Sequence, residues 1–451
     1  MTIFRAYDAR GVYPEEINAD LAFRIGMAFG RFIGKGTVSV GCDARLSSPE
    51  LKEAVIRGLS GSGLKVMDIG MVPTQMLYFS VAYMKLDGGI MITASHNPKE
   101  YNGFKFCIKN GVSLSYETGI DRIEKWVSKD SWLLKARGSV QKKDLKKEYM
   151  DHVLKHVKIK NGLKIVIDAG NGVGGLVAPD LFRKLGCGVT ELFCKPDGSF
   201  PNHHPDPLVK ENLRALQKAV VSAKADLGIA FDGDADRVSF VDERGDIIEN
   251  NSVFAILIKD ALRDNPGSRI LYEILASRMI SDVIKSEGGV EVVSRVGHSY
   301  IQNTMIEKKC ILGGETSAHY FFMESYSYDD GIFAAAKLVS FLSQAGRQIS
   351  SFVNELPKYF TSDDTRISCN DEKKFKVVKY LKEKFRKNGF EMMTIDGVKV
   401  FFRDRKSWFV ARVSNTQPAI VIRWEAMDKK EFERVGSFIK GEIESAIKAI
   451  S

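Results

Sequence analysis

The chain has 451 residues, too many for one ordinary hydrophobic core, and at roughly 100–150 residues per domain it predicts three or four domains. Apolar residues make up 44% and charged residues 27%, as in soluble globular proteins, and no apolar run reaches the ~18 residues of a membrane span. The net charge of +9 is modest and scattered, which fits a pocket for acidic small molecules better than a nucleic-acid surface.

One pattern of strand, helix and strand occurs three times along the chain. The first copy runs from V-S-V-G-C-D at 38–43, through a helix that starts near Ser48, to the strand K-V-M-D-I. K-I-V-I-D at 164–168 and R-I-L-Y-E at 269–273 open the second and third copies, each followed by a helix, a Gly-rich stop and another strand. Three such units predict three α/β domains of related topology.

The last segment follows a different order. A helical stretch beyond Lys374 precedes strands around T-I-D-G-V-K-V, W-F-V-A-R-V and A-I-V-I-R-W, and a closing helix carries an apolar stripe from Phe432 to Ile447. Strands enclosed by helices predict a fourth, α+β domain, joined to the rest by the polar segment T-S-D-D-T at 361–365.

The six cysteines show no C-x-x-C pairing, and most lie in apolar runs, which predicts a reduced, cytoplasmic protein. The opening M-T-I-F-R-A-Y-D-A-R has no apolar core before a cleavage site, so we expect no targeting segment. We therefore expect small molecules as partners, with neither a nucleic acid nor a membrane.

Four short polar loops, each directly after an apolar stretch that reads as a strand, carry groups that bind phosphate, a divalent metal or a sugar hydroxyl. If they converge on one cleft, they form an active site for phosphoryl transfer on a sugar. The four loops are T-A-S-H-N-P at 93–98, D-G-D-A-D-R at 232–237, G-E-T-S-A-H at 314–319 and R-V-S-N-T at 412–416.

The second loop predicts a metal site. Asp232, Asp234 and Asp236 alternate along an extended loop and can converge on one hard cation, which favours Mg²⁺ with positions left open for a phosphoryl oxygen. An EF-hand is the competing interpretation, because Glu243 falls at the twelfth position of such a loop. It fails because Arg237 stands where Gly is needed and the flanking segments read as strands. A solvated acidic turn is the plain structural alternative.

The first loop predicts a covalent intermediate. Ser95 follows the strand G-G-I-M-I, at the end where α/β active sites lie, and a hydroxyl beside a metal can carry a phosphoryl group. Ten residues on, Lys105 lies between apolar neighbours, and partial desolvation can lower the pKa of a lysine enough for a general base. An ordinary turn and an exposed lysine are the plain alternatives.

The third and fourth loops predict the grip on the substrate. The third offers a carboxylate, a hydroxyl and an imidazole on one face to vicinal sugar hydroxyls, from Glu315, Ser317 and His319. The fourth offers a phosphate cradle of side chains and turn amides, with a plain hairpin turn as the alternative. The candidate residues of this cradle are Arg412, Ser414, Asn415 and Thr416, with Arg423 on the next strand.

A dinucleotide site is a further alternative. G-N-G-V-G-G satisfies G-x-G-x-x-G at Gly170, Gly172 and Gly175, opens a helix, and is followed by Glu191 near the end of the next strand. The motif is permissive in a Gly-rich chain, and a dehydrogenase gives no role to the aspartate triplet, Ser95 or the cradle. This interpretation is therefore disfavoured.

Taken together, the loops resemble the α-D-phosphohexomutase superfamily, in its bacterial-type phosphomannomutase/phosphoglucomutase branch. The likeness covers nearly the whole chain and keeps the order of the loops. The matching segments are F-R-A-Y-D-A-R-G near the N-terminus, T-A-S-H-N-P followed by Y-N-G-F-K, F-P-N-H-H-P-D-P at 200–207, D-G-D-A-D-R, G-H-S at 297–299, G-E-T-S-A-H and R-V-S-N-T.

The resemblance implies an α/β fold in which three related mixed α/β domains and a C-terminal α+β domain surround a central cleft. These are a phosphoserine domain (1–146), a metal-binding domain (147–250), a sugar-binding domain (251–362) and a phosphate-binding domain (363–451). It implies a mutase, a monomer or homodimer, that interconverts the 1- and 6-phosphates of mannose, glucose or both. Its cofactors would be Mg²⁺ and, as activator, glucose 1,6-bisphosphate or mannose 1,6-bisphosphate.

The same likeness implies roles for single residues. Ser95 would be phosphorylated, and its phosphate would share Mg²⁺ with the three aspartates. Lys105 would be the general base, Arg10 and Arg237 would hold charge at the transferred phosphate, and His298 would lie near the reacting end. The sugar would be gripped by Glu315, Ser317 and His319, and the phosphate that does not react by Arg412, Ser414, Asn415, Thr416 and Arg423.

Two residues depart from the pattern of the resemblance. Leu275 stands where related enzymes often carry a lysine that reaches the ligand, and Gln417 replaces a more usual Glu or Thr in the cradle. The first departure leaves substrate preference and turnover open. Phosphoglucosamine mutase is the nearest alternative, disfavoured by R-V-S-N-T and F-P-N-H-H-P-D-P. A non-catalytic sugar-phosphate binding protein is the alternative from another class, disfavoured by the intact Ser95, Lys105 and aspartate triplet.

Overall fold

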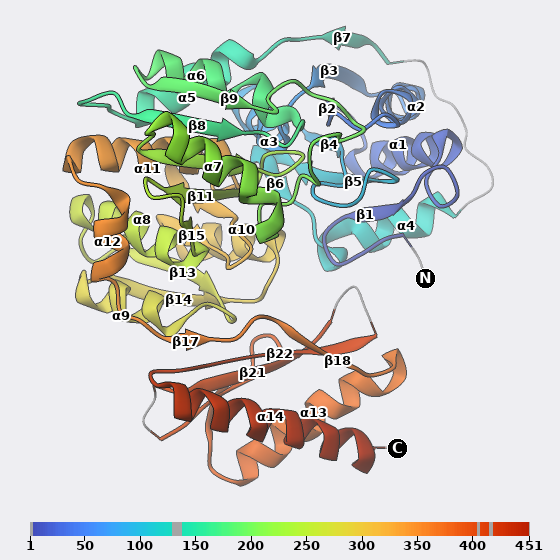
Figure 1. Ribbon diagram of the computed structural model, residues 1–451. Coiled ribbons are helices and arrows are strands. Elements are labelled where there is room, and N and C mark those ends of the chain that lie inside the picture. Colours follow the sequence, from blue (N-terminus) through green and yellow to red (C-terminus); the bar gives the residue numbers. More distant parts are fainter. Residues whose placement is uncertain (1–2, 129–137, 404–405, 415–417, 451) are drawn as a thin grey trace.

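The structure is a computed structural model that describes residues 3–128, 138–403, 406–414 and 418–450. Within these residues the strands form four sheets, each from a separate stretch of the chain. Figure 1 shows the first three sheets and their helices packed together, with the fourth sheet set below them and reached through β17 (Phe360–Thr361). No helix among the described residues is both long and apolar enough to cross a membrane.

The first sheet has the strand order β1-β5-β4-β2-β3-β7, with β6 beside β5. Asn18 accepts a hydrogen bond from the amide of Leu21 at the start of its first helix, and Gly34, with φ of 84°, follows the end of that helix. Its elements are β1 (Ala9–Val12), α1 (Ala19–Ile33), β2 (Thr37–Cys42), α2 (Ser48–Gly61), β3 (Lys65–Met71), α3 (Thr74–Tyr83), β4 (Gly88–Ile92), β5 (Tyr101–Ile108), β6 (Val112–Ser113), α4 (Asp121–Val127) and β7 (Val140–Lys142).

The second and third sheets have the orders β12-β11-β10-β8-β9 and β14-β13-β15-β16. The second comprises α5 (Lys146–His156), β8 (Lys164–Asp168), α6 (Ala178–Lys184), β9 (Gly188–Leu192), α7 (Arg214–Ala223), β10 (Leu227–Phe231), β11 (Val238–Asp242) and β12 (Ile247–Ile248). The third comprises α8 (Asn250–Asp264), β13 (Arg269–Glu273), α9 (Arg278–Ser286), β14 (Val290–Ser294), α10 (His298–Lys308), β15 (Leu312–Gly314), β16 (Tyr320–Phe322), α11 (Gly331–Ala345) and α12 (Ile349–Glu355).

The three sheets share one topology, which confirms the predicted repeat. In β3-β2-β4-β5, β9-β8-β10-β11 and β14-β13-β15-β16, the first three strands are parallel and the last is antiparallel to its neighbour. In every copy the antiparallel strand follows the third parallel strand through a short loop. The loop between those two strands therefore emerges at an equivalent place in each domain.

The fourth sheet is antiparallel, with the order β17-β22-β21-β20-β19 and β18 beside β22. Helices α13 and α14 cover its outer face (Figure 1). Its further elements are β18 (Thr365–Ser368), α13 (Asp371–Lys387), β19 (Glu391–Met393), β20 (Val398–Phe401), β21 (Trp408–Val413), β22 (Ala419–Ala426) and α14 (Lys429–Ala449).

Two expectations about this last segment change. The run T-I-D-G-V-K-V does not form one strand: residues 394–397 are the turn between β19 and β20, with Gly397 at φ 76°. The expected linker at 361–365 is bordered by β17 and β18, which both pair with β22. The polar residues therefore bridge two edge strands of the fourth sheet, because backbone pairing there does not require apolar side chains.

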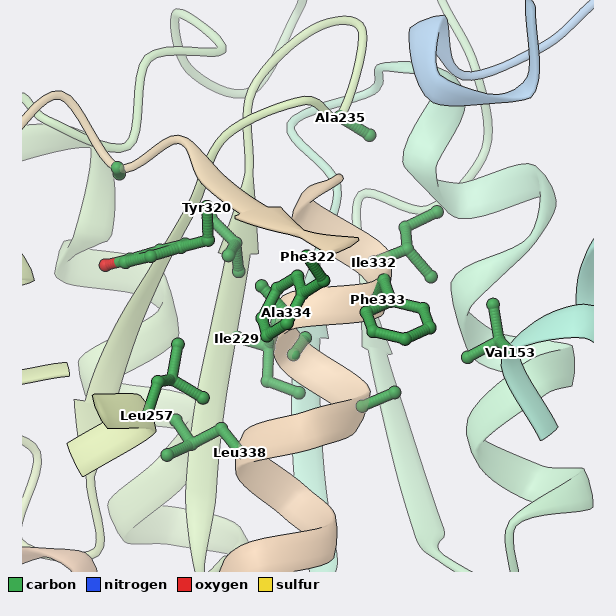
Figure 2. Close-up of a cluster of buried hydrophobic side chains, with 14 of the residues drawn as sticks. Val153, Ile229, Ala235, Leu257, Tyr320, Phe322, Ile332, Phe333, Ala334 and Leu338 are labelled. Atoms are coloured by element: carbon green, nitrogen blue, oxygen red, sulfur yellow. The ribbon is translucent and has the colours of Figure 1, made fainter. Parts of the chain in front are cut away.

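One apolar core runs through the first three domains. Ile332, Phe333 and Leu338 of α11 belong to the same buried cluster as Ile229 of β10 and Val153 of α5 (Figure 2). The fourth domain has its own core between its sheet and its two helices. A small buried cluster, Ile274 and Leu275 with Trp408 and Val410, joins it to the third domain. The six cysteines are buried free thiols, as the sequence suggests.

Candidate active site

The first three polar loops all lie between the third and fourth strands of the repeated sheet, β4 to β5, β10 to β11 and β15 to β16. They meet directly. A Cβ atom added to Gly233 would lie 2.5 Å from the carbonyl oxygen of Ser95, and Arg237 forms a β-bridge with His319. The repeated topology thus brings together segments that are 82 to 137 residues apart in the sequence.

The predicted metal ligands converge. Asp232, Asp234 and Asp236 are buried, and one carboxylate oxygen from each lies within 4.8 Å of the others. Oδ1 of Asp234 and Oδ1 of Asp236 have no hydrogen-bond partner among the described residues. Buried carboxylate oxygens without partners are costly unless a cation meets them. This arrangement fits Mg²⁺, which takes oxygen ligands and keeps positions for a phosphoryl group.

Ser95 lies beside this cluster. Its Oγ donates a hydrogen bond of 2.6 Å to Oδ2 of Asp232 and lies 3.0 Å from Nδ1 of His96. The backbone of Ser95 has φ of 51°, a left-handed conformation that residues other than glycine seldom adopt. Such backbone strain concentrates at functional sites, because the surrounding structure must hold it in place.

Lys105 of β5 also contacts the aspartates, but the expectation that its pKa is lowered is wrong. Its Nζ donates to Asp234 at 2.9 Å and also to Asp236. Burial lowers the pKa of Lys105, but attraction to these two carboxylates outweighs burial, and the pKa lies well above its ordinary value. The desolvation argument failed because sequence spacing could not place two charges against the ammonium group.

The pKa values of two of the carboxyl groups, Asp232 and Asp236, shift in opposite directions. Burial, followed by repulsion from Asp234 and Asp236, holds the pKa of Asp232 well above its usual range. Burial also raises the pKa of Asp236, but attraction to Lys105 and then to His319 outweighs burial and holds this pKa well below the usual range. Asp232, the carboxyl group next to the serine, is therefore a weaker acid than Asp236.

The two arginines expected at the transferred phosphate contact two different loops of the site, Arg10 the serine loop and Arg237 the loop of His319. Nε of Arg10 donates to Asp8 at 2.7 Å, and its Nη1 donates to Oδ1 of Asn97 at 2.7 Å. Nε of Arg237 lies 3.3 Å from Nε2 of His319. The serine and the aspartates are thus bordered by two guanidinium groups, which suits a dianionic phosphoryl group.

The sugar loop is folded back on itself. Glu315 accepts a hydrogen bond of 2.8 Å from the amide of Gly297 and lies 2.9 Å from Nδ1 of His319, whose ring also lies 3.0 Å from the hydroxyl of Ser317. Burial and Arg237 oppose a charged ring, but Asp236 and Glu315 outweigh them and raise the pKa of His319 to about 9. His298 is buried beside this loop, and neither of its ring nitrogens has a hydrogen-bond partner among the described residues.

The predicted cradle is described only in part. Nε of Arg412 donates to Asp396 at 3.1 Å, and Asp396 also accepts the amide of Val296 from the third domain at 3.2 Å. Arg423 lies 3.7 Å from Asp364, and Ser414 is buried at the end of β21. Two further predicted cradle residues, together with the departure at the neighbouring position, lie outside the described residues: Asn415, Thr416 and Gln417.

Comparison with known proteins identifies the family. Four family models match consecutive stretches of the chain: phosphoglucomutase/phosphomannomutase alpha/beta/alpha domain I over 1–133, domain II over 147–245, domain III over 249–360 and the C-terminal domain over 365–440. The chain belongs to the phosphoglucomutase/phosphomannomutase family.

Two relatives and one solved structure show how far the likeness extends. A phosphomannomutase/phosphoglucomutase of Pseudomonas aeruginosa is 38% identical over 448 residues, 98% of this chain and 96% of the relative. A phosphoglucomutase of Neisseria gonorrhoeae is 40% identical over 450 residues, covering 98% and 97%. A phosphoglucomutase/phosphomannomutase family protein of Burkholderia thailandensis, solved by crystallography, has a TM-score of 0.91 at 34% identity and covers 99% of this chain and 98% of its own.

Backbone packing explains the glycine-rich segment that matched a dinucleotide-binding motif. In this phosphoglucomutase/phosphomannomutase chain a Cβ atom at Gly172 would lie 2.5 Å from the carbonyl oxygen of Gly233, and one at Gly175 would lie 1.9 Å from that of Cys194. Glycine is needed there for close packing of two backbones, one of them the metal loop. The dehydrogenase interpretation has no support in the structure.

The sequence analysis missed a residue that holds the loop of Ser95 in place. Arg45 is fully buried, and its two Nη atoms donate to four main-chain carbonyl groups at 2.6 to 2.9 Å, those of Ser95, Asn97, Pro98 and Tyr101. Its Nε pairs with Asp43 at 3.1 Å. The only sign of this residue in the sequence was the polar run D-A-R-L-S-S after a buried strand. Nothing in the sequence indicated that the guanidinium group contacts the serine loop.

Two threonines were missed as well. Thr74 at the start of α3 donates from its hydroxyl to Oδ2 of Asp234 at 2.6 Å, and Thr93 donates to the same oxygen at 3.2 Å. These bonds fix the carboxylate so that its other oxygen faces the cluster. The sequence offers no signal for Thr74, because its partner lies 160 residues away.

Leu275, the departure from the family pattern, is buried between domains. It belongs to an apolar cluster with Ile274 and with Trp408 and Val410 of β21. Lys399 of β20 donates to the carbonyl oxygens on either side of it, 2.9 Å for Ile274 and 3.2 Å for Ala276. This loop therefore packs against the fourth domain.

Proposed function

We propose that this protein interconverts hexose 1-phosphates and hexose 6-phosphates, of mannose, glucose or both, through phosphorylated Ser95 and a 1,6-bisphosphate. The observation that carries the proposal is the serine hydroxyl 2.6 Å from a buried carboxylate of the aspartate triplet, with two guanidinium groups beside it. A sugar-phosphate binding protein without catalysis has no use for a strained serine at that place. The names of the relatives agree with this reaction.

We propose the following division of labour, domain by domain. Residues 1–146 carry the phosphoserine, 147–250 the metal ligands Asp232, Asp234 and Asp236, 251–362 the sugar-binding groups, and 363–451 the cradle for the distal phosphate. The cofactors are Mg²⁺, held by the aspartates and the serine phosphate, and a glucose or mannose 1,6-bisphosphate activator. Bound Mg²⁺ neutralises charge on the transferred phosphoryl group.

The side chains then act on substrate and proton. Arg10 and Arg237 hold the equatorial oxygens of the phosphoryl group, where charge accumulates during transfer. Lys105 would take the proton of the attacking hydroxyl as a neutral amine, and a cation held by Asp234 and Asp236 would favour that neutral form. His298 lies near the reacting end of the sugar, and the hydroxyl groups of the sugar are held by Glu315, Ser317 and His319.

The distal phosphate is bound by the fourth domain. Arg412, Ser414, Asn415, Thr416 and Arg423 form its cradle in our proposal. The bisphosphate reorients between the two transfers so that either phosphate can occupy it, and one reacting site and one distant site then suffice for both directions. Six buried free thiols agree with a cytoplasmic enzyme.

Leu275 bears on the choice of sugar. Its burial against Trp408 keeps it from the substrate, so the charge that related enzymes often supply from this position is missing here. A hexose that is recognised by the third-domain loop alone does not need this charge, so it remains a good substrate. We therefore propose mannose phosphate, glucose phosphate or both as substrates. R-V-S-N-T and F-P-N-H-H-P-D-P argue against glucosamine phosphate.

The test is a coupled assay with mannose 1-phosphate, glucose 1-phosphate and glucosamine 1-phosphate, each with Mg²⁺ and a trace of the matching 1,6-bisphosphate. We expect turnover with at least one of the first two and much less with the third. Omitting the bisphosphate from dephosphorylated protein should lower the initial rate, because Ser95 then starts unphosphorylated. Absence of turnover with all three sugars, from protein shown to be folded and to bind Mg²⁺, contradicts the proposal.

A further inference from the structure

Glu273, the last residue of β13, has a fully buried carboxylate between two loops of the third domain. Its Oε1 accepts the amide of Thr316 at 3.2 Å and the hydroxyl of the same residue at 2.8 Å. Its Oε2 accepts the amide of Leu275. One carboxylate therefore ties the loop between β15 and β16 to the loop that follows β13.

The first of these loops carries the groups assigned to the sugar. Thr316 stands between Glu315 and Ser317 in the sequence. Its amide donates to Glu273, and its carbonyl oxygen accepts Nδ2 of Asn250 at 3.1 Å. The main chain is thus bonded at both polar groups of this residue, so a shift of the carboxylate moves the side chains on either side of it.

The second loop is held by the fourth domain. Nζ of Lys399 donates to the carbonyl oxygens of Ile274 and Ala276, at 2.9 and 3.2 Å. The same nitrogen lies 3.6 Å from the centre of the Trp408 ring, and Leu275 packs in one apolar cluster with that ring. A shift of the fourth domain therefore acts on the main chain on both sides of the residue whose amide the carboxylate accepts.

Most of this link is buried. Glu273, Leu275 and Lys399 lie away from solvent, so a hydrogen bond that breaks here is not replaced by one to bulk water. Burial lowers the pKa of Lys399 to about 8, although Glu425 and then Glu273 raise it. The ammonium group of the fourth domain and the carboxylate of the third domain therefore attract each other across the loop.

We propose that Glu273 is a positioning residue that couples the fourth domain to the sugar-binding loop. This role rests on the proposed function, in which the third-domain loop grips the hexose and the fourth domain binds the distal phosphate. When the fourth domain shifts, residues 274–276 shift with it, the carboxylate follows, and Thr316 follows the carboxylate. The grip on the hexose is thereby linked to the grip on the distal phosphate.

Binding to protein with unphosphorylated Ser95 is measured by calorimetry, without turnover. Glu273→Gln keeps the size of the side chain but places an NH₂ group against one of the two loops, because an amide has only one acceptor oxygen. The affinity for glucose 1-phosphate and mannose 1-phosphate should fall by about 10- to 100-fold, the scale on which a misplaced binding group acts. The affinity for inorganic phosphate, which does not contact the sugar loop, should stay unchanged.

The outcomes separate this role from the proposed function. Wild-type protein that binds neither hexose phosphate rejects the proposed function itself. Wild-type affinity that falls equally for hexose phosphate and inorganic phosphate in Glu273→Gln, or does not fall at all, rejects only the role of this residue.

Two further variants support the comparison. Glu243→Gln is the matched control, because it neutralises another largely buried glutamate, which accepts the hydroxyl of Ser350, and it should leave all affinities unchanged. If Glu273→Gln fails to fold, Thr316→Val removes only the hydroxyl bond to Oε1 and should again weaken hexose phosphate binding without weakening phosphate binding.

A double-mutant cycle tests the coupling itself. Lys399→Met removes the donor to residues 274 and 276 and keeps a long side chain beside Trp408. If the two residues act through one another, the loss of hexose phosphate affinity in the double variant with Glu273→Gln should be smaller than the product of the two single losses. Lys384→Met, which breaks a pair with Glu442 elsewhere in the fourth domain, should change neither the single nor the combined value. Losses that multiply for Lys399→Met and Glu273→Gln refute coupling through this carboxylate.

Discussion

The hydroxyl of Ser95 donates a 2.6 Å hydrogen bond to Asp232 across 137 residues of chain. Burial and two neighbouring carboxylates raise the pKa of Asp232 well above its usual range, so the serine faces a weaker acid than Asp236. The hydroxyl group and the aspartate cluster are thereby in contact before any substrate arrives. This contact makes Ser95 the group whose loss should be most damaging.

Ser95→Ala should lower turnover by at least about a thousandfold, the scale on which removal of a covalent nucleophile acts. Intact-mass analysis of the wild type after incubation with glucose 1,6-bisphosphate should show one phosphoryl adduct on the peptide that contains Ser95. Ser80→Ala is the control, because it removes a buried hydroxyl of the same domain that bonds to Ser39. Near-normal turnover of Ser95→Ala without an adduct would show that the phosphate is carried elsewhere.

Asp234→Asn should weaken Mg²⁺ binding and move the Mg²⁺ dependence of turnover to higher concentration. The variant removes one of three charges from the cluster while the amide still accepts from Thr74 and Thr93. Asp68→Asn, which breaks a pair with Lys52 outside the cluster, is the control. A Mg²⁺ titration that is identical in wild type and Asp234→Asn means that the triplet is only an acidic turn.

Arg45→Lys should lower kcat by roughly 10- to 100-fold and leave KM nearly unchanged, because several charge-assisted hydrogen bonds to the serine loop are lost. Arg45 contacts main-chain carbonyl groups of the serine loop and Asp43 but no reacting atom, so we regard it as a positioning residue. Hydrolysis of the phosphoserine should also become faster as the loop loosens. Arg244→Lys, at an exposed arginine paired with Asp242, is the control. Equal losses in kcat and in thermal stability, with unchanged phosphoserine hydrolysis, would reduce Arg45 to a structural role.

Two histidines should give opposite pH dependences of stability. Burial and then His156 lower the pKa of His152 to about 4. Since an unfolded histidine titrates near 6.5, the unfolded state takes up its proton first, and stability falls as the pH drops from about 6.5 to 4. His152→Phe should remove this part of the acid sensitivity in thermal unfolding. Phe preserves the aromatic contact with Phe79.

His203 supplies the contrast. Burial lowers its pKa, but the hydrogen bond and charge of Asp168 outweigh burial and raise it. Its stabilisation is therefore complete below the unfolded pKa and is lost as the pH rises through the folded pKa. His203→Gln should cost more stability at about pH 5 than at about pH 8. If the effects of the two substitutions on stability changed with pH in the same direction, these assignments would be contradicted.

The sequence predicted those parts of the molecule that depend on local pattern. Strand–helix–strand periodicity gave the three repeats, and the alternating aspartates gave the metal cluster. The sequence did not predict that the pKa of Lys105 is raised. It also did not predict that Arg45 holds the serine loop, that Thr74 holds Asp234, or that Glu315 pairs with His319. Each depends on distances between distant segments, and only the folded repeat, with its loops in equivalent places, sets those distances.

The fourth domain should move when substrate binds. It has its own core, and it meets the third domain through a small apolar cluster around Leu275 and Trp408 and through polar contacts. In these contacts Asp396 accepts from both Arg412 and the amide of Val296, and Lys399 donates to Ile274 and Ala276. A phosphate that engages Arg412 competes with Asp396 for the guanidinium and so couples ligand binding to the domain contact.

Small-angle scattering with and without glucose 1,6-bisphosphate measures this movement. We expect a smaller radius of gyration with ligand, because the cradle reaches the distal phosphate only when the domains approach, and closure protects the phosphoserine from water. Arg412→Ala should weaken both ligand binding and compaction, whereas Arg434→Ala, at a surface pair with Glu431, should change neither. An unchanged radius at demonstrated saturation, together with a normal KM for Arg412→Ala, would exclude both the domain movement and the phosphate role, because each requires this arginine to leave Asp396 for the ligand.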